Sequence, residues 1–282
     1  MSAMGIYYAS LSRALGRGLW EAFQGLNVTN ANFIELINTR TYGGLRRGQS
    51  FVDQDLGNKF RLVRARGALT GVGYIVKSYL GAAGRVGNLT AASTKAVLTT
   101  DDTFVEHDLA GGLVYLNAGT GIGQMRPIMD NSDAAGASTI TLAVKDRSYP
   151  GAHTAVDSPD ALATAPDATT DYLVVCPWEV VETSAVTDYV VGVALGAVTD
   201  GNWTIILEEG YGLVRVAGDT DPSVLDEGIM PSAAAGTAKG YTTAATTIDE
   251  PARTFARALA AKATAASNWF CHVKVPFPIG AN

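Results

Sequence analysis

The segment Tyr189–Asp219 reads YVVGVALGAVTDGNWTIILEEGYGLVRVAGD. Asp200-Gly201 stands in it between two runs rich in β-branched and aromatic residues, Val190–Val198 and Trp203–Ile206. An Asp-Gly pair between such runs is a strong local signal of a β-hairpin, because a tight turn needs residues that tolerate positive φ angles. The segment therefore predicts two antiparallel strands joined by a turn at Asp200-Gly201.

Further short β-rich runs, separated by clusters of Gly, Asp, Asn and Ser, follow one another along the chain after Lys59. Their regular spacing predicts an all-β barrel or sandwich. The other candidate strands are Phe60–Val63, Val72–Ser78, Lys95–Thr99, Gly112–Asn117, Thr139–Val144, Tyr172–Val175, Leu213–Ala217 and Asn268–Val275.

The last candidate strand alternates in character. Trp269, Cys271 and Val273 fall on one face of an extended chain, and Phe270 and His272 fall on the other. We therefore expect one face of this strand to be buried.

Length and composition limit the class of protein. The chain has 282 residues, of which 47% are apolar and 17% are charged, against about 25% charged residues in an average domain. These values exclude general disorder, collagen and a coiled coil. No apolar run has the length of a membrane helix, and the amino terminus does not have the pattern of a signal peptide. We expect a soluble protein, made in a reducing compartment.

The charges are divided unevenly along the chain. Residues 1–100 hold 12 Lys/Arg and 4 Asp/Glu, whereas residues 101–282 hold 9 and 23. A basic segment is attracted to an acidic surface, and an acidic body repels its own kind. No nucleic-acid-binding module accompanies the scattered arginines, so we expect no nucleic-acid partner.

The basic segment starts with a helical pattern. Between Leu11 and Leu26, the residues Leu11, Leu15, Leu19 and Phe23 recur at helical spacing, which predicts an amphipathic helix. Its apolar stripe packs on the protein's own body or on a partner. Residues Asn27–Asn58 are predicted to form an extended arm with little core of its own.

Three later segments are predicted from composition and spacing. Asp146–Thr170 and Pro231–Thr247 have the composition of long loops, and we expect both to serve as contact loops. Glu250–Ala266 has Phe255 and Leu259 at helical spacing, which predicts a helix.

Groups suited to catalysis or metal binding are few. His107, His153 and His272 have no second His or Cys at metal-ligand spacing, and the two cysteines favour buried thiols. Glu106-His107-Asp108 contains parts of a triad, but no nucleophile motif accompanies it. Asp219, Asp221 and Asp226 do not match the spacing of a calcium loop, which favours a solvated turn. We expect no catalytic centre, cofactor or metal.

Two further patterns have structural interpretations. Gly119-Thr-Gly-Ile-Gly123 follows a candidate strand like a dinucleotide loop, but Pro127 prevents the helix that such a loop needs, so we expect a turn. The acidic pairs Glu208-Glu209 and Glu179/Glu182 are what a glycosidase would use, and a strand leaving the core explains Glu208-Glu209 equally well. The tryptophans, Trp20, Trp178, Trp203 and Trp269, suit packing better than sugar platforms.

The order of these segments resembles one family. The run DDTFVEHDLAGGLVYLNAGTGIGQMRPIMDNSDAAGASTITLAV (101–144) and the hairpin at 189–219 are similar to those of decoration, or cement, proteins from tailed-bacteriophage heads. AGTAKG (235–240) and ARALAAKATAASNWFCHVKV (256–275) resemble the ending of that family. The resemblance covers about Lys95–Pro276 and lies in order and character, with no catalytic motif.

The resemblance implies a fold and a function. The implied fold is mainly β, an antiparallel β-barrel or β-tulip body (95–282), and the basic helix and arm before it (1–94) are predicted from charge and spacing alone. The protein would trimerise on the outer capsid surface, in the virion, and fasten neighbouring copies of the major capsid protein. The resemblance also implies that Arg253–Leu259 is extended, in conflict with the predicted helix.

Charge and shape assign the partner-binding role to residues 1–94, with the capsid or an adjacent copy as partner. Two alternatives stay open, namely another virion component, such as a head fibre or tail-associated adhesin, and a carbohydrate-binding protein or glycan hydrolase. Neither a membrane nor a nucleic acid is expected as partner. The residues predicted to bind the partner are Leu11, Leu15, Leu19, Phe23, Arg46, Arg47, Arg61 and Arg64.

Overall fold

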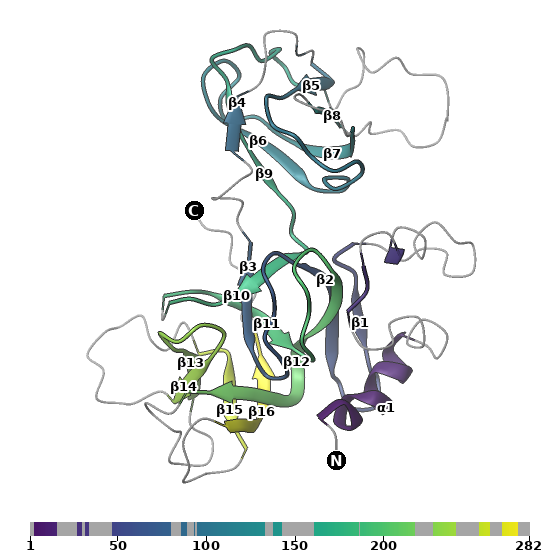
Figure 1. Cartoon of the computed structure of the whole chain (residues 1–282), viewed down its shortest axis with the longest axis vertical. Coiled ribbons are helices and arrows are strands. Elements are labelled where there is room, and N and C mark those ends of the chain that lie inside the picture. The colour runs from purple at the N-terminus through teal and green to yellow at the C-terminus, as the bar shows by residue number, and fades with distance from the viewer. Residues whose placement is uncertain are drawn as a thin grey trace. The chain divides into compact units, whose positions relative to one another are not determined.

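A computed structural model provides the structure of the protein. It describes residues 3–15, 27–29, 32–33, 47–79, 86–88, 93, 95–132, 138–142, 161–185, 187–217, 228–240, 254–259 and 267–275. The predicted mainly-β class is confirmed, with α1 (Ala3–Leu15) near the amino terminus (Figure 1). The strands are β1 (Ser50–Val52), β2 (Lys59–Ala65), β3 (Ile75–Ser78), β4 (Val86–Asn88), β5 (Val97–Thr99), β6 (Leu113–Ala118), β7 (Met125–Asn131), β8 (Thr139–Leu142), β9 (Asp171–Val175), β10 (Glu179–Glu182), β11 (Val190–Ala194), β12 (Trp203–Val216), β13 (Gly228–Pro231), β14 (Ala238–Gly240), β15 (Ala256–Ala258) and β16 (Ser267–Lys274).

The chain folds as two compact units. Unit 1 comprises residues 1–78 and 178–282, and unit 2 comprises residues 79–177. This division does not coincide with the segments 1–94 and 95–282. Strands β1–β3 of the basic segment belong to the same unit as β10–β16 of the acidic segment, because β2 pairs with both β10 and β12.

Unit 1 contains a ten-stranded sheet in the order β1-β2-β10-β3-β11-β12-β14-β13-β15-β16. Two additional pairings, β2–β12 and β12–β16, close the strands into two circuits that share β12. The pairs β2–β10 and β12–β14 are parallel, so this sheet is mixed rather than antiparallel throughout. The barrel or tulip shape of the body stays a prediction.

Strand β12 changes partner near its middle. Residues 203–209 pair with β2, and residues 209–216 pair with β16. The register with β2 shifts between Leu207 and Glu209, and Gly210 follows with a φ of 113°. An irregular register and a glycine in the left-handed region bend a strand, as Figure 1 shows for β12. The predicted run Trp203–Ile206 and the predicted strand Leu213–Ala217 are therefore two parts of one bent strand.

The core of unit 1 includes residues from the predicted arm. Phe33 is fully buried, and its ring stacks on that of Trp203 at a centroid distance of 3.8 Å. Val28 forms a bridge to Trp203, with its N–H donating to the Trp203 carbonyl at 2.9 Å. The described residues of the predicted arm, 27–58, therefore contribute to the core of unit 1, and no separate core of the arm is seen in them.

Unit 2 contains a six-stranded sheet in the order β4-β9-β6-β7-β8-β5, and every recorded strand pairing in it is antiparallel. One face of the sheet forms a core, because alternate residues along β6, β8 and β9 are buried. The largest of these is Tyr172, whose hydroxyl donates to Asp102 at 2.6 Å. Other buried residues are Leu98, Val114, Leu116, Ile128, Ile140, Leu142 and Val174.

The glycine-rich segment between β6 and β7 is a turn, as predicted. Gly119, Gly121 and Gly123 all have positive φ angles, between 74° and 86°. The Thr120 hydroxyl donates to Asp167 at 2.7 Å, and the Gln124 carboxamide oxygen accepts the Ala163 N–H at 2.7 Å. In its described part, the predicted contact loop 146–170 therefore packs on a turn of its own unit.

Two predicted helices and one predicted loop differ, at least in part, from the structure. The predicted helix Leu11–Leu26 is present up to Leu15 and begins earlier, at Ala3, while residues 16–26 lie outside the described part. The predicted helix Glu250–Ala266 is wrong at Ala256–Ala258, which form β15 between β13 and β16. Segment 231–247 contains the pairing β13–β14 within its described part, so it is not a loop throughout.

Candidate interaction surfaces

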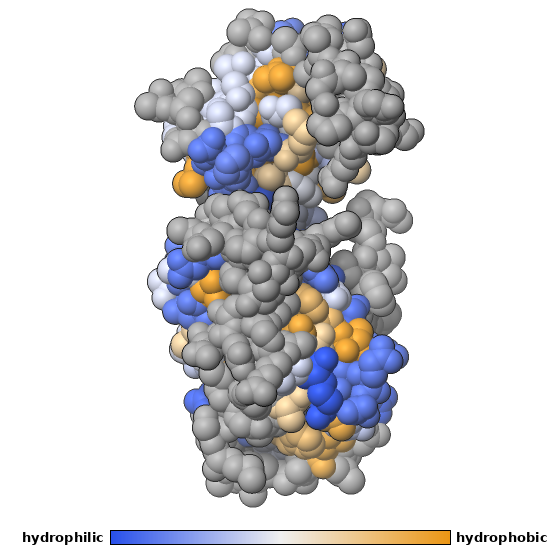
Figure 2. All heavy atoms as spheres, turned by 90° about the vertical axis from the view of Figure 1, so that its right-hand side faces the viewer, coloured by the Kyte–Doolittle hydropathy of each residue, from blue (hydrophilic) through white to orange (hydrophobic). Residues whose placement is uncertain are grey.

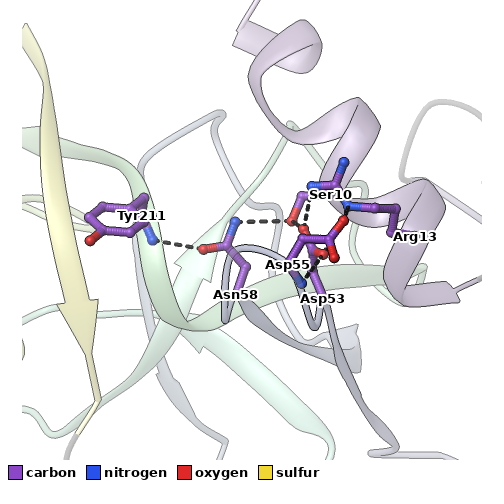
Figure 3. Close-up of polar contacts among 6 residues, drawn as sticks. All are labelled: Ser10, Arg13, Asp53, Asp55, Asn58 and Tyr211. Atoms are coloured by element: carbon purple, nitrogen blue, oxygen red, sulfur yellow. Dashed lines mark hydrogen bonds and ion pairs between the residues drawn. The ribbon is translucent and has the colours of Figure 1, made fainter.

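The amino-terminal helix is attached to the turn between β1 and β2 by a buried carboxylate (Figure 3). Asp53 is fully buried and accepts hydrogen bonds from the Ser10 hydroxyl at 2.6 Å and from Arg13 Nε and Nη2 at 2.9 and 2.7 Å. The hydrogen bonds from Arg13 hold the pKa of Asp53 well below its usual range. Arg13 Nε also lies 3.2 Å from the exposed Asp55.

Asn58 extends this network to β12. Its side-chain nitrogen donates to the Ser10 hydroxyl at 3.0 Å, and its side-chain oxygen accepts the Tyr211 N–H at 2.9 Å (Figure 3). A Cβ on Gly210 would lie 2.8 Å from the Asn58 Cα, so only glycine allows this approach. The helix, the β1–β2 turn and the bend of β12 are thus one hydrogen-bonded assembly.

The predicted apolar stripe of the helix is used, in part, inside unit 1. Leu11 is fully buried and Leu15 is half-buried. Leu19 and Phe23 lie outside the described residues. Packing on the protein's own body therefore accounts for Leu11, and its predicted contact with a partner is not needed to explain its burial.

Arg64 belongs to a buried cluster of opposite charges. Glu179, at the start of β10, is fully buried. Arg66 Nε donates to Glu179 Oε1 at 2.7 Å, and Arg64 Nη1 lies 3.9 Å from the same oxygen. Arg64 Nε donates to the Gly201 carbonyl at 2.9 Å, in the predicted hairpin turn. Burial raises the pKa of the Glu179 carboxyl, and the charges of the nearby arginines oppose that rise.

The neighbouring arginines have different surroundings. The guanidinium carbon of Arg47 lies 5.9 Å from the centroid of the Trp178 ring, at a distance typical of a cation–π contact. Arg46 lies outside the described residues. Arg47 is half-buried, and its guanidinium group lies beside the buried Trp178 of unit 1.

Arg61 is paired with a second acidic residue of unit 1. Its Nε lies 2.7 Å from Glu208 Oε1, and Lys59 Nζ lies 3.3 Å from Glu208 Oε2. The Ser50 hydroxyl donates to Glu208 Oε2 at 3.1 Å. Glu208 is buried in β12, so these contacts compensate for the cost of removing its charge from water. Arg61, Arg64 and Arg47 thus have structural contacts, and their binding to a partner stays a prediction.

These contacts give a structural explanation for the uneven distribution of charge along the chain. By sequence, unit 1 holds 16 Lys/Arg and 16 Asp/Glu, whereas unit 2 holds 5 and 11. The basic segment therefore neutralises the acidic strands with which it folds. The net charge of −6 is that of unit 2 alone.

Unit 2 exposes apolar side chains on the face of its sheet opposite the core. Tyr115 and Met125 are registered partners on β6 and β7, with exposed fractions of 37% and 54%. Met129, on the same face of β7, is 49% exposed. Leu113, Pro127, Leu173 and Val175 are registered neighbours on this face. We call this surface, made by Leu113, Tyr115, Met125, Pro127, Met129, Leu173 and Val175, the unit 2 face.

The seven residues of the unit 2 face are uncharged, although the unit around it is acidic. Asp171 lies on the same side of β9 as Leu173 and Val175, and Asp130 follows Met129 on β7, so two carboxylates border the apolar residues. Figure 2 shows one side of the molecule, on which apolar residues (orange) lie directly beside strongly hydrophilic ones (blue). A sheet that is apolar on both faces is typical of one that is covered on both faces. The unit 2 face has the composition of a protein-binding surface with a polar rim.

A second exposed cluster lies on unit 1, across β12 and β16. Tyr211 and Phe270 are each 44% exposed, and their rings are nearly parallel, with centroids 6.1 Å apart. His272 meets the edge of Tyr211 at 5.2 Å. The predicted alternation along the last strand is confirmed, since Trp269, Cys271 and Val273 are buried.

The residues considered for catalysis, metal binding or sugar stacking have different surroundings. His107 has a φ of 63°, and its Nδ1 lies 2.8 Å from Asp130 Oδ1 in an exposed turn. Cys176 and Cys271 are both buried, as predicted, and burial raises the pKa of Cys271 to about 12. Trp178, Trp203 and Trp269 are buried, which confirms packing. His153, Trp20 and the aspartates at 219, 221 and 226 lie outside the described residues.

Within the described part of the chain, no three His, Cys, Asp or Glu side chains gather closely enough to hold a metal ion. No described helix has the length and apolar character to cross a membrane. No protein family, curated protein or solved structure matches this chain.

Proposed function

We propose that the protein is a capsid decoration, or cement, protein. It binds the outer surface of a tailed-phage head as a homotrimer and stabilises the lattice of the major capsid protein. It is made in the host cytoplasm and ends in the virion, and it acts by adhesion rather than by catalysis. The resemblance of residues 95–276 to decoration proteins supports the family, and the unit 2 face supports the mode of action.

The unit 2 face is the observation that carries the proposal. Covering one exposed Tyr or Met side chain stabilises a complex by about 1.5 kcal/mol. A face built from three adjacent strands, with Tyr115, Met125 and Met129 as large exposed side chains, offers several such contacts on one surface. Its strands also hold the side chains in place, which lowers the entropy lost on binding.

The net charge of unit 2 supports one orientation of the protein on the capsid. Unit 2 is acidic outside this face, so separate trimers repel one another in solution. On a capsid the repulsion acts between neighbours, while the uncharged unit 2 face rests on the lattice. Symmetry then multiplies contacts that are individually weak.

Fewer residues of the basic segment are available to bind a partner than the sequence predicts. Arg61 and Arg64 are engaged inside unit 1, as is Leu11. We assign the main capsid contact to the unit 2 face, and any contact made by the basic segment to residues before Arg47.

The test uses purified heads that lack the protein. We expect Tyr115→Ser/Met125→Ser to bind these heads about 100-fold more weakly than the unchanged chain, since each substitution removes about 1.5 kcal/mol of apolar contact. Tyr189→Ser is the matched control, because Tyr189 is 63% exposed on unit 1. It should bind normally.

Occupancy is measured by co-sedimentation and by imaging of the particles, and the solution mass reports the trimer. Equal occupancy by the double variant and the unchanged chain would refute the assignment of the unit 2 face. Binding to isolated tails in preference to heads would favour the adhesin alternative.

A further inference from the structure

The cluster on β12 and β16 has a composition unlike that of the unit 2 face. Strand register places Tyr211 opposite His272, Leu213 opposite Phe270, and Glu209 opposite Lys274. Arg257 on β15 is the registered neighbour of His272 on its other side. We call the surface formed by Glu209, Tyr211, Leu213, Arg215, Arg257, Asn268, Phe270, His272 and Lys274 the aromatic face.

The aromatic face carries excess positive charge. Arg215, Arg257 and Lys274 contribute three cations, against the single carboxylate of Glu209. Within the described residues, Lys274 and Arg215 make no ion pair, unlike the cations of β2 and β3. The surface therefore favours an anionic ligand.

Its apolar part is small and flat. Tyr211 and Phe270 are nearly parallel, at an interplanar angle of 15°, and both remain 44% exposed. Leu213 is the other apolar member of the face. Polar side chains that donate hydrogen bonds surround them, from Arg215, Asn268, His272, Arg257 and Lys274.

We propose that the aromatic face binds an acidic polysaccharide. The C–H groups of a sugar ring are weakly positive and lie well against the negative face of an aromatic ring. The hydroxyl groups of the sugar pair with the surrounding donors and with the Glu209 carboxylate, and its carboxylate groups pair with Lys274 and Arg215. One carboxylate and no partner acid on this face suit binding without cleavage.

Two other anionic partners fit less well. A protein partner needs a larger apolar centre, such as the unit 2 face has, than two rings and one leucine. A nucleic acid requires a strongly basic surface to offset its phosphates, whereas unit 1 is neutral overall and the chain carries −6. A polyuronate has fewer charges per unit length than a nucleic acid duplex. It also offers many sugar rings that can lie against the aromatic side chains.

The inference goes beyond the proposed function and does not depend on it. A single sugar contact on an open surface is weak, and many copies on one particle would raise the avidity. The intact chain can be tested alone, without capsids.

The experiment is affinity electrophoresis of the full chain in gels containing alginate, dextran, polyglutamate or oligothymidylate. We expect alginate, a polyuronate, to retard the protein, with less retardation at higher salt, and dextran, a neutral glucan, to retard it little. Tyr211→Ala/Phe270→Ala should weaken alginate binding at least tenfold. Lys274→Ala should weaken it several-fold and reduce its salt dependence.

Tyr189→Ala, which removes an exposed ring elsewhere on unit 1, is the control and should bind alginate normally. Absence of retardation by alginate would overturn the proposal, as would unchanged binding by both the double variant and Lys274→Ala. Equal or stronger retardation by polyglutamate would instead identify an acidic protein as the partner, and by oligothymidylate a nucleic acid. If the double variant does not fold, Lys274→Ala decides, since Lys274 is exposed near the end of β16.

Discussion

Arg66 and Glu179 are 113 residues apart in the sequence and form a direct ion pair, with Arg66 Nε and Nη2 both 2.7 Å from Glu179 Oε1. Arg66 follows β2 in the basic segment, and Glu179 starts β10 in the acidic one. Lys77 and Asp188 make a similar link at 3.0 Å, between β3 and the residues before β11. The opposite charges of the two segments thus join strands within unit 1.

Replacing Arg66 should destabilise unit 1. Arg66→Met leaves the buried Glu179 carboxylate without its closest counter-charge, and we expect a loss of about 3 kcal/mol in the free energy of unfolding. Tryptophan fluorescence in urea measures this loss for unit 1 alone, because Trp20, Trp178, Trp203 and Trp269 all belong to that unit.

Two variants accompany Arg66→Met. Arg66→Met/Glu179→Met removes both charges and should be more stable than the single variant by about 1 kcal/mol or more. Lys77→Met, which breaks the more exposed pair with Asp188, should cost about 1 kcal/mol or less. Equal losses for Arg66→Met and Lys77→Met would contradict the importance of burial at Glu179.

The sequence predicts β2, β9, β11 and β16, together with the short β5 and β8, but misses β1, β13 and the seven-residue β7. The runs of β2, β9, β11 and β16 are strong signals, because apolar, β-branched or aromatic residues recur over several positions in each. Strands of three or four residues, such as β1 and β13, offer too few positions for a pattern. In β7, Pro127 argues against a strand, yet the strand pairs with β6 and β8 around it.

The alanine residues of the segment explain why a helix is wrongly predicted at Ala256–Ala258. Ala256 and Ala258 are buried in β15, and Arg257 between them is exposed, which is the alternation of a strand. Alanine has a high intrinsic helix propensity, and in this segment the pairing with β13 and β16 overrides it. The extended conformation implied by the family resemblance agrees with the structure in the described residues 254–259.

The interaction surfaces were hidden for a different reason. The basic residues were expected to meet a partner because the sequence separates them from the acidic ones. Folding pairs Arg61 with Glu208 and Arg66 with Glu179, which only strand register reveals. The alternation of β6 and β7 could have indicated the unit 2 face, since Tyr115 and Met125 fall on the face opposite to Val114 and Ile128.

Asp53 should anchor the amino-terminal helix in a pH-dependent manner. Asp53→Asn weakens the bonds from Ser10 and Arg13, and we expect a loss of about 2 kcal/mol at neutral pH, reduced from the fully buried value because Arg13 is partly exposed. Asp55→Asn, at a side chain that is 72% exposed, should cost about 0.5 kcal/mol or less.

The pH dependence follows from the lowered pKa of Asp53. The pKa is lower in the folded than in the unfolded chain, so the contribution of Asp53 to stability is complete above the unfolded value of about 3.9. It is lost as the pH falls from there through the folded pKa. Unfolding titrations should therefore give a constant difference between the unchanged chain and Asp53→Asn from pH 7 to about pH 5, and a shrinking difference below about pH 4. A difference that grows in acid would contradict this assignment.

The two thiols should report the two units separately. Cys176 belongs to unit 2 and Cys271 to unit 1, and both are buried. Because only an exposed thiolate reacts readily, we expect neither to react with Ellman's reagent in the native protein, and both to react in guanidinium chloride. Mass spectrometry after a pulse of alkylating agent at intermediate denaturant shows which unit opens first. Rapid reaction of Cys271 in the native state would contradict its burial against β12 and β15.

Gly210 should be irreplaceable where β12 bends, whereas Gly57 should tolerate a side chain at moderate cost. Both have positive φ angles, 113° and 71°, so alanine is strained at either position. A Cβ at Gly57 would meet no atom within 4 Å, and we expect Gly57→Ala to cost about 1 kcal/mol. A Cβ at Gly210 would lie 2.8 Å from the Asn58 Cα, which is backbone and cannot rotate away.

Gly210→Ala should therefore force β12 away from Asn58. The Asn58 side chain would then lose the Tyr211 N–H, and its bond to Ser10 would be disturbed. We expect a loss of about 3 kcal/mol or more in the free energy of unfolding, measured by tryptophan fluorescence. Because the network continues to α1, hydrogen exchange in that helix should also become faster in Gly210→Ala than in Gly57→Ala. Similar costs at the two glycines would show that φ strain alone matters, and that the contact between Asn58 and Gly210 does not control the bend.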